Sequence, residues 1–166
     1  MLRTHYNTNF EKRMLPIILV TNNVGNAANI GSLFRVSDAF GVEKLILGGN
    51  NIPLGRKMAK TSRATEKVVD FELTENIFEV VSNLKSQGYQ IISLEITETS
   101  KPIHNFSFKQ DQKIALIVGD ENFGVSDDIL KISDAIIHID MFGQNSSMNV
   151  VQATNIALYE ITRQFL

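Results

Sequence analysis

Cysteine is absent from this chain of 166 residues. Its absence excludes disulfide frameworks, thiolate zinc sites, iron–sulfur clusters and a cysteine nucleophile. The three histidines, His5, His104 and His138, are far apart in the sequence, so we expect no metal centre. His138 lies in an apolar run and is interpreted as a structural strand residue. The chain also lacks a G-x-x-x-x-G-K-[S/T] phosphate loop and a G-x-G-x-x-G turn, the main signatures of nucleotide hydrolysis and standard dinucleotide binding.

Long hydrophobic segments and a one-sided charge are also missing. The longest apolar runs, such as 16–20 and 114–118, reach about a quarter of the ~20 residues that a membrane helix needs. The polar start MLRTHYNTNFEKRM lacks the apolar centre of a secretory signal, so we expect a cytoplasmic protein. The net charge is -2, from 16 basic and 18 acidic residues, which excludes a globally basic nucleic-acid coat. Any contact with RNA must therefore come from a local patch.

Short apolar runs alternate with helical patterns along most of the chain. With 43% hydrophobic residues, we expect a single domain at 15–166 after a short arm at 1–14. The predicted strands are 16–21, 44–47, 90–95, 113–118 and 135–139, and the predicted helices are 29–40, 75–87, 126–132 and 148–164. The strands show little polar alternation, which is typical of strands covered on both faces. The pattern predicts an α/β fold with a mainly parallel sheet flanked by helices.

Three segments that follow predicted strands are rich in glycine, asparagine and serine. They are NNVGNAANIGSLFR at 22–35, GDENFG at 119–124 and DMFGQNSSMN at 140–149. Ligands of open parallel sheets bind beyond the carboxyl ends of the strands, so these segments are the first candidates for a site. Glycine allows close backbone approach, and asparagine and serine supply neutral hydrogen bonds.

Each of these segments also has a purely structural interpretation. Asn29 could cap the first helix, and Arg35 could be a surface arginine or pair with Asp38. The segment 119–124 could be an ordinary turn with glycines at positive φ. Ser146 or Ser147 could simply cap the last helix.

One segment is basic although the whole chain is slightly acidic. Residues 55–67, GRKMAKTSRATEK, carry five cations and one acid, or a local charge of +4. The cations expected to contact RNA phosphates are Arg56, Lys57, Lys60 and Arg63. A solvated helix face is the other interpretation of this basic strip.

In this order, the three segments resemble the three motifs of the SpoU (TrmH-type) branch of the SPOUT RNA methyltransferases. Motif one is NIGSLFR at 29–35 with DAFGV at 38–42, and motif two is IVGDENFG at 117–124. Motif three is IDMFG at 139–143, followed by SMNV at 147–150 and ALYE at 157–160. The resemblance extends from Leu15 almost to the end of the chain. The family often has Pro where Asp140 stands and Leu where Met148 stands, and neither change removes a side chain expected to do chemistry.

The resemblance implies a trefoil-knotted α/β fold, a homodimer and S-adenosylmethionine as cofactor. It also implies that the final helix lies in the dimer interface and that the two protomers share the active site. By position, the residues expected to line the cofactor site are Leu94, Glu95, Gly119, Ile139, Met141 and Met148.

The activity implied by the resemblance is methyl transfer to a ribose 2'-hydroxyl of tRNA or rRNA. Arg35 is expected to stabilise the developing alkoxide as a cation, while a substrate phosphate or water takes the proton. The residues expected to orient Arg35, the ribose or the loop are Asn29, Glu121, Ser147 and Asn149. Two alternatives remain: a catalytically inactive RNA-binding homologue with the same fold, and an α/β enzyme that acts on a small molecule.

Overall fold

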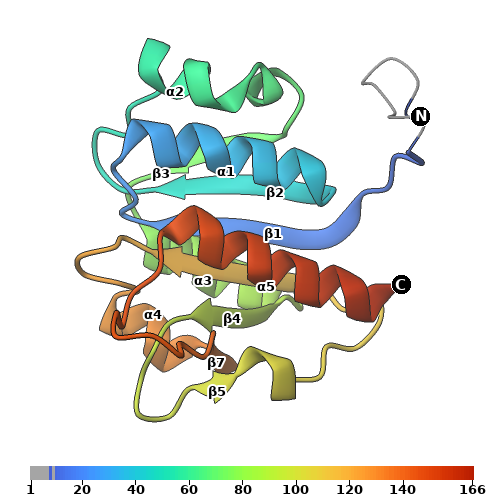
Figure 1. The fold of residues 1–166 in the computed structure, drawn as a ribbon, viewed down its shortest axis with the longest axis vertical. Coiled ribbons are helices and arrows are strands. Elements are labelled where there is room, and N and C mark those ends of the chain that lie inside the picture. Colours follow the sequence, from blue (N-terminus) through green and yellow to red (C-terminus); the bar gives the residue numbers. More distant parts are fainter. Residues whose placement is uncertain (1–7, 9) are drawn as a thin grey trace.

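The computed structural model describes residue 8 and residues 10–166, which form a parallel sheet covered by helices on both faces (Figure 1). Residues 1–7 and 9 of the predicted arm lie outside the described residues. The strands are β1 (Leu15–Asn22), β2 (Val42–Gly48), β3 (Phe71–Thr74), β4 (Gln90–Leu94), β5 (Lys101–Pro102), β6 (Ile114–Gly119) and β7 (Ala135–His138). The helices are α1 (Ala27–Ala39), α2 (Arg56–Ser62), α3 (Ile77–Ser86), α4 (Asp127–Ile132) and α5 (Val150–Phe165), with 3-10 turns at Thr65–Lys67 and Ile103–Asn105.

The strand order places the glycine- and asparagine-rich segments side by side, at the carboxyl ends of the strands. The order is β3-β2-β1-β6-β4-β7-β5, and every neighbouring pair is parallel. This confirms the predicted α/β fold. Strands β1, β6, β4 and β7 are consecutive neighbours, so the segments that follow them leave from adjacent points of the same edge. The trefoil knot stays a prediction, because strand order does not describe how the chain is threaded.

Strand β1 is covered on both faces, which explains why its sequence lacks polar alternation. Ile17 and Leu19 belong to the core beneath α1 and α5, whereas Ile18 and Val20 belong to the core beneath α3 and α4. All four side chains are buried. Figure 1 shows α1 and α5 on the near face and α3 and α4 behind the sheet. Both faces are therefore apolar, as the uninterrupted hydrophobic run predicts.

The five predicted strands are confirmed, while three short elements were missed. Strand β3 pairs only with β2, and its partly exposed side chains give no continuous apolar run. Strand β5 has two residues and leaves too short a pattern to detect. Helix α2 lies in the basic strip and buries only Met58 and Ser62 of its seven residues.

Within residues 8 and 10–166, every helix is too short or too polar to traverse a bilayer.

Two predicted helix starts need correction. Asn26, not Asn29, caps α1: its side-chain oxygen accepts hydrogen bonds from the backbone N–H of Ala28 at 2.9 Å and of Asn29 at 3.2 Å. The capping interpretation of Asn29 is therefore wrong, and its side chain is available for other contacts. Ser126 does precede α4, but its hydroxyl makes no capping hydrogen bond.

Candidate active site

A pocket of about 310 Å³ opens where β4, β6 and β7 end. Its volume is at the lower end of the range of ~300–1,000 Å³ that is typical of small-molecule sites. The segments that follow these strands form its walls. All the residues predicted for the cofactor site line it, namely Leu94, Glu95, Gly119, Ile139, Met141 and Met148. Glu121 and Ser147, two of the predicted catalytic residues, line it as well.

The turn at 119–124 forms one wall of the pocket, and its shape depends on glycine. The Asp120 carboxylate accepts hydrogen bonds from the backbone N–H of Asn122 at 2.8 Å and of Phe123 at 3.3 Å. A Cβ atom on Gly119 would lie 2.1 Å from the carbonyl carbon of Gly124, which itself has a φ of 65°. The turn can therefore close only with glycine at both ends.

Two side chains hold this turn against the sheet. Glu95 accepts a hydrogen bond from the backbone N–H of Val125 at 2.9 Å, which joins the end of β4 to the turn. Asn22, at the end of β1, accepts one from the backbone N–H of Ser126 at 2.7 Å. Asn22 is only 2% exposed, and sequence analysis gave it no individual role. A polar residue that ends a fully apolar strand is the signal that could have identified it.

A chain of hydrogen bonds connects the three glycine- and asparagine-rich segments. The Asn29 amide donates to the Glu121 carboxylate, and the Asn149 amide donates to the Asn29 carbonyl oxygen at 3.2 Å. These residues are 92 and 120 positions apart in the sequence. The contacts place Asn29 and Asn149 beside the pocket, because Glu121 is part of its wall. Three of the predicted catalytic residues thus form one polar cluster.

Asn149 has a second contact, which corrects the prediction for the last helix. Its side-chain oxygen accepts hydrogen bonds from the backbone N–H of Val151 at 2.9 Å and of Gln152 at 3.4 Å, and so caps α5. The predicted caps, Ser146 and Ser147, do not serve this purpose. Ser147 instead bonds to the Asn145 side chain within the loop.

The comparisons with known proteins agree with this geometry. A family model, described as the SpoU rRNA Methylase family, matches residues 16–159. This chain belongs to that family. The match includes the pocket, the polar cluster and the three segments that resemble the SpoU motifs.

Two sequence relatives are longer than this chain and are matched over part of their length. A tRNA (guanosine(18)-2'-O)-methyltransferase of Aquifex aeolicus is 31% identical over 154 residues, which are 93% of this chain and 72% of the relative. A Staphylococcus aureus protein assigned to the TrmH family of tRNA/rRNA methyltransferases is 26% identical over 155 residues, 93% of this chain and 61% of that protein. The chain thus spans about three fifths to three quarters of these relatives.

Solved structures confirm the fold. The A. aeolicus TrmH/SpoU tRNA modifying enzyme superposes with a TM-score of 0.83 at 31% identity, over 93% of this chain and 77% of that one. The SpoU methyltransferase AviRb of Streptomyces viridochromogenes, solved in complex with AdoMet, gives a TM-score of 0.80 at 24% identity, over 93% and 62%. The second likeness concerns the fold alone.

Arg35 of the first SpoU motif lies outside the pocket of its own chain. It is exposed on α1, six residues and about one and two-thirds turns beyond Asn29. Its side chain does not belong to the pocket wall, and among the described residues it forms no ion pair with Asp38. One chain therefore does not bring Arg35 to the pocket.

His138, which sequence analysis treated as a structural strand residue, is part of the pocket wall. Its ring lies 2.8 Å from the Ser100 hydroxyl and 3.2 Å from the Asp140 carboxylate, which His104 also approaches at 3.5 Å. These contacts tie the loop after β4 to motif three. Within the described residues, no group of three or more potential ligands is arranged to hold a metal ion.

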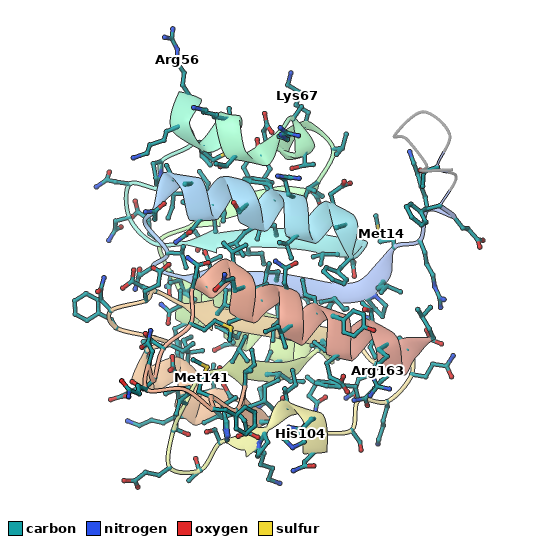
Figure 2. All side chains as sticks on the ribbon, viewed as in Figure 1. Met14, Arg56, Lys67, His104, Met141 and Arg163 are labelled. Carbon is teal, nitrogen blue, oxygen red and sulfur yellow. The ribbon has the colours of Figure 1, made fainter. Side chains whose placement is uncertain are left out.

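The basic strip forms α2 and the 3-10 turn after it, packed on α1. Its cations are exposed, and Figure 2 shows Arg56 and Lys67 at its two ends. A Cβ atom on Gly31 would lie 2.0 Å from the Thr61 hydroxyl oxygen, so motif one needs glycine for α2 to approach. Within the strip, a hydrogen bond from the Ser62 hydroxyl lowers the pKa of Glu66.

Proposed function

We propose that this chain is an S-adenosylmethionine-dependent RNA methyltransferase that modifies a ribose 2'-hydroxyl of tRNA or rRNA. The observation that supports this most is the hydrogen-bonded cluster of Asn29, Glu121 and Asn149, which joins all three SpoU motifs beside one pocket. Family membership supports the reaction class. The names of the relatives support tRNA or rRNA as the substrate.

The pocket fits the proposed cofactor. S-adenosylmethionine supplies a methyl group already activated on a positively charged sulfur. Leu94, Ile139 and Met141 belong to the wall as apolar residues, and Glu95 and Glu121 belong to it as acids, whose negative charge favours a cation nearby. The fold likeness to an AdoMet-bound SpoU enzyme is consistent with this assignment.

The proposed catalytic groups position the ribose and stabilise charge. Asn29, Glu121 and Asn149 hold one another in place beside the pocket, so the cluster is preorganised to position the ribose. Arg35 stabilises the negative charge on the attacking oxygen, because a guanidinium keeps its proton and is a poor base. The proton passes to water or to a substrate phosphate.

The position of Arg35 supports a homodimer with shared sites. Since Arg35 is exposed and is not part of its own pocket wall, we infer that the partner chain supplies it to that pocket. Helix α5 offers a partner surface, with Tyr159 61% exposed and Ile156 39% exposed on it. Two chains then complete two sites.

The basic strip holds the RNA. Its cations bind phosphates and contribute affinity and salt dependence with little sequence preference. A tRNA or rRNA substrate is consistent with a location in the cytoplasm. The acceptor must be RNA, because DNA lacks the 2'-hydroxyl.

Incubation of the purified chain with methyl-labelled S-adenosylmethionine and either unmodified total RNA or DNA tests this function. We expect label in RNA and none in DNA, with incorporation lost in Asn29→Ala. Asn83→Ala, an exposed asparagine on α3 behind the sheet, is the matched control and should retain activity. RNA binding without transfer would identify the inactive homologue. Label in neither nucleic acid would favour the small-molecule enzyme.

A further inference from the structure

Two phenylalanines beside the pocket are almost completely exposed. Phe123 in motif two is 90% exposed and Phe142 in motif three is 96% exposed. Phe123 lines the pocket, and Phe142 directly follows Met141, which also lines it. Within the described part of the chain, neither ring stacks on another aromatic ring. Because these rings contribute almost nothing to the core, their position at the pocket calls for a binding role.

The backbone that carries Phe123 is ordered before any ligand arrives. Its own N–H donates to the Asp120 carboxylate at 3.3 Å, and Gly124 closes the turn immediately after it. Glu95 then anchors the turn through Val125. A ring held on such a turn loses little freedom on binding, which favours its use as a contact surface.

The local charge determines what these rings can bind. Glu95, Asp120 and Glu121 belong to the same pocket wall, so a phosphate group is repelled there. An uncharged aromatic base is not repelled by these carboxylates. The cations that suit phosphates lie on α2, whose Arg56 is at the top of Figure 2, while Met141 of the pocket wall is in its lower half. The charges thus direct the RNA backbone to α2 and leave the pocket mouth to bases.

We propose that Phe123 and Phe142 stack on unpaired nucleobases of the substrate RNA, next to the ribose that is methylated. This inference rests on the proposed function. Aromatic side chains bind single-stranded RNA in this way because every base offers a flat π-face. Bases within a duplex are already stacked on their neighbours, so the rings select an unpaired region.

Fluorescence anisotropy with two probes tests the proposal. One probe is single-stranded oligoadenylate, and the other is an abasic ribose-phosphate oligomer with the same number of phosphates. We expect the unmodified chain to bind oligoadenylate at least about fivefold more tightly. Phe123→Leu and Phe142→Leu should each reduce this preference, while Phe123→Tyr and Phe142→Tyr should retain it.

Phe10→Leu is the matched control, because Phe10 is 85% exposed but precedes β1, whereas the pocket lies where the strands end. This variant should keep the preference for oligoadenylate. Equal binding of both probes by the unmodified chain, or an unchanged preference in both leucine variants, would overturn the proposal.

Two other roles of the rings are contact with the cofactor and contact with a partner chain. Calorimetry with S-adenosylmethionine tests the first, and sedimentation of the free chain tests the second. A leucine variant that loses cofactor affinity but keeps the base preference would assign its ring to the cofactor. A variant that changes the association state but not the base preference would assign it to the dimer interface. Either result contradicts base stacking. Transfer of methyl groups to RNA without any base preference would reject this inference and leave the proposed function intact.

Discussion

Asn149 uses the two ends of one amide group for different purposes. Its oxygen caps α5, and its nitrogen donates to Asn29 in the polar cluster. Asn149→Asp keeps an oxygen for the cap but removes the donor. We expect an unfolding free energy close to that of the unmodified chain and a clear loss of methyl transfer. Asn149→Ala should lose transfer and also about 1 kcal/mol of stability. Urea unfolding and initial transfer rates measure both effects; full activity in Asn149→Asp would rule out a role for the donor.

Arg35 is proposed to act through a planar, charged fork rather than through charge alone. Arg35→Lys keeps the charge and loses the fork, so we expect kcat to fall by about 100-fold while cofactor affinity is maintained. Arg13→Lys is the control, since Arg13 is an exposed arginine that precedes β1 and pairs with Asp111 only at 4.0 Å. Single-turnover rates and calorimetry test the expectation, and a fully active Arg35→Lys would contradict the geometric part of the mechanism.

At the residue scale, sequence patterns predicted the pocket well and the hydrogen bonds poorly. The six expected cofactor residues all line the pocket, because their motifs follow strands that end at one edge. The capping roles went to Asn26 and Asn149 instead of Asn29 and the serines. Several polar residues near a helix start are chemically equivalent in sequence, and only the backbone geometry selects one of them.

Helices α1 and α2 pack closely enough that one methyl group should separate them. Gly31→Ala would place a Cβ atom 2.3 Å from the Met58 carbonyl oxygen, which is backbone and cannot rotate away. We expect a loss of about 1–3 kcal/mol of stability and weaker RNA binding, because α2 carries the basic strip. Gly25→Ala is the control, as no atom lies within 4 Å of its added Cβ. Equal stability of the two variants would show that the close approach is unimportant.

The end of α5 contains an ion pair with a defined pH dependence. The Arg163 guanidinium donates two hydrogen bonds to Glu160, at 2.7 and 3.0 Å, and with the Gln164 amide it lowers the pKa of Glu160 below its ordinary value of 4.5. A lowered folded-state pKa stabilises the fold above 4.5, and this contribution disappears as the pH falls through the lowered value.

Glu160→Gln should therefore be less stable than the unmodified chain at pH 7, and the difference should vanish in acid. Glu98→Gln, at an exposed glutamate in a loop, provides the control. Thermal unfolding across this pH range measures the difference for each variant. A difference for Glu160→Gln that is independent of pH would show that packing, rather than charge, accounts for its effect.

At the scale of elements, long apolar runs were easy to recognise and short polar ones were not. Strands β1 and β6 are buried on both faces, so their sequences contain an unbroken signal. Strand β3 and helix α2 lie at the periphery and bury few residues, so tertiary packing decides their structure. The elements that the sequence patterns missed lie at the periphery of the fold, whereas the strands around the pocket were predicted correctly.

At the scale of the whole molecule, the central question is how Arg35 reaches a pocket. If the partner supplies Arg35, each site combines Glu121 of one protomer with Arg35 of the other. Arg35→Ala and Glu121→Ala then remove groups that two different protomers contribute to a site. A mixed dimer then contains one site with both defects and one site with none. We expect the mixed dimer, isolated after coexpression of the two inactive variants, to have up to half of the activity of the unmodified dimer. Mixed dimers without activity would indicate that each site uses residues of one chain.

The position of the transferred methyl group decides whether the chain carries out the proposed reaction. RNA treated with the chain and S-adenosylmethionine carrying a deuterated methyl group is digested to nucleosides and analysed by mass spectrometry. We expect deuterium on the ribose, as a 2'-O-methylnucleoside whose base fragment has no added mass. Deuterium on a base, or RNA that acquires none under conditions where the chain binds both RNA and cofactor, would contradict this expectation.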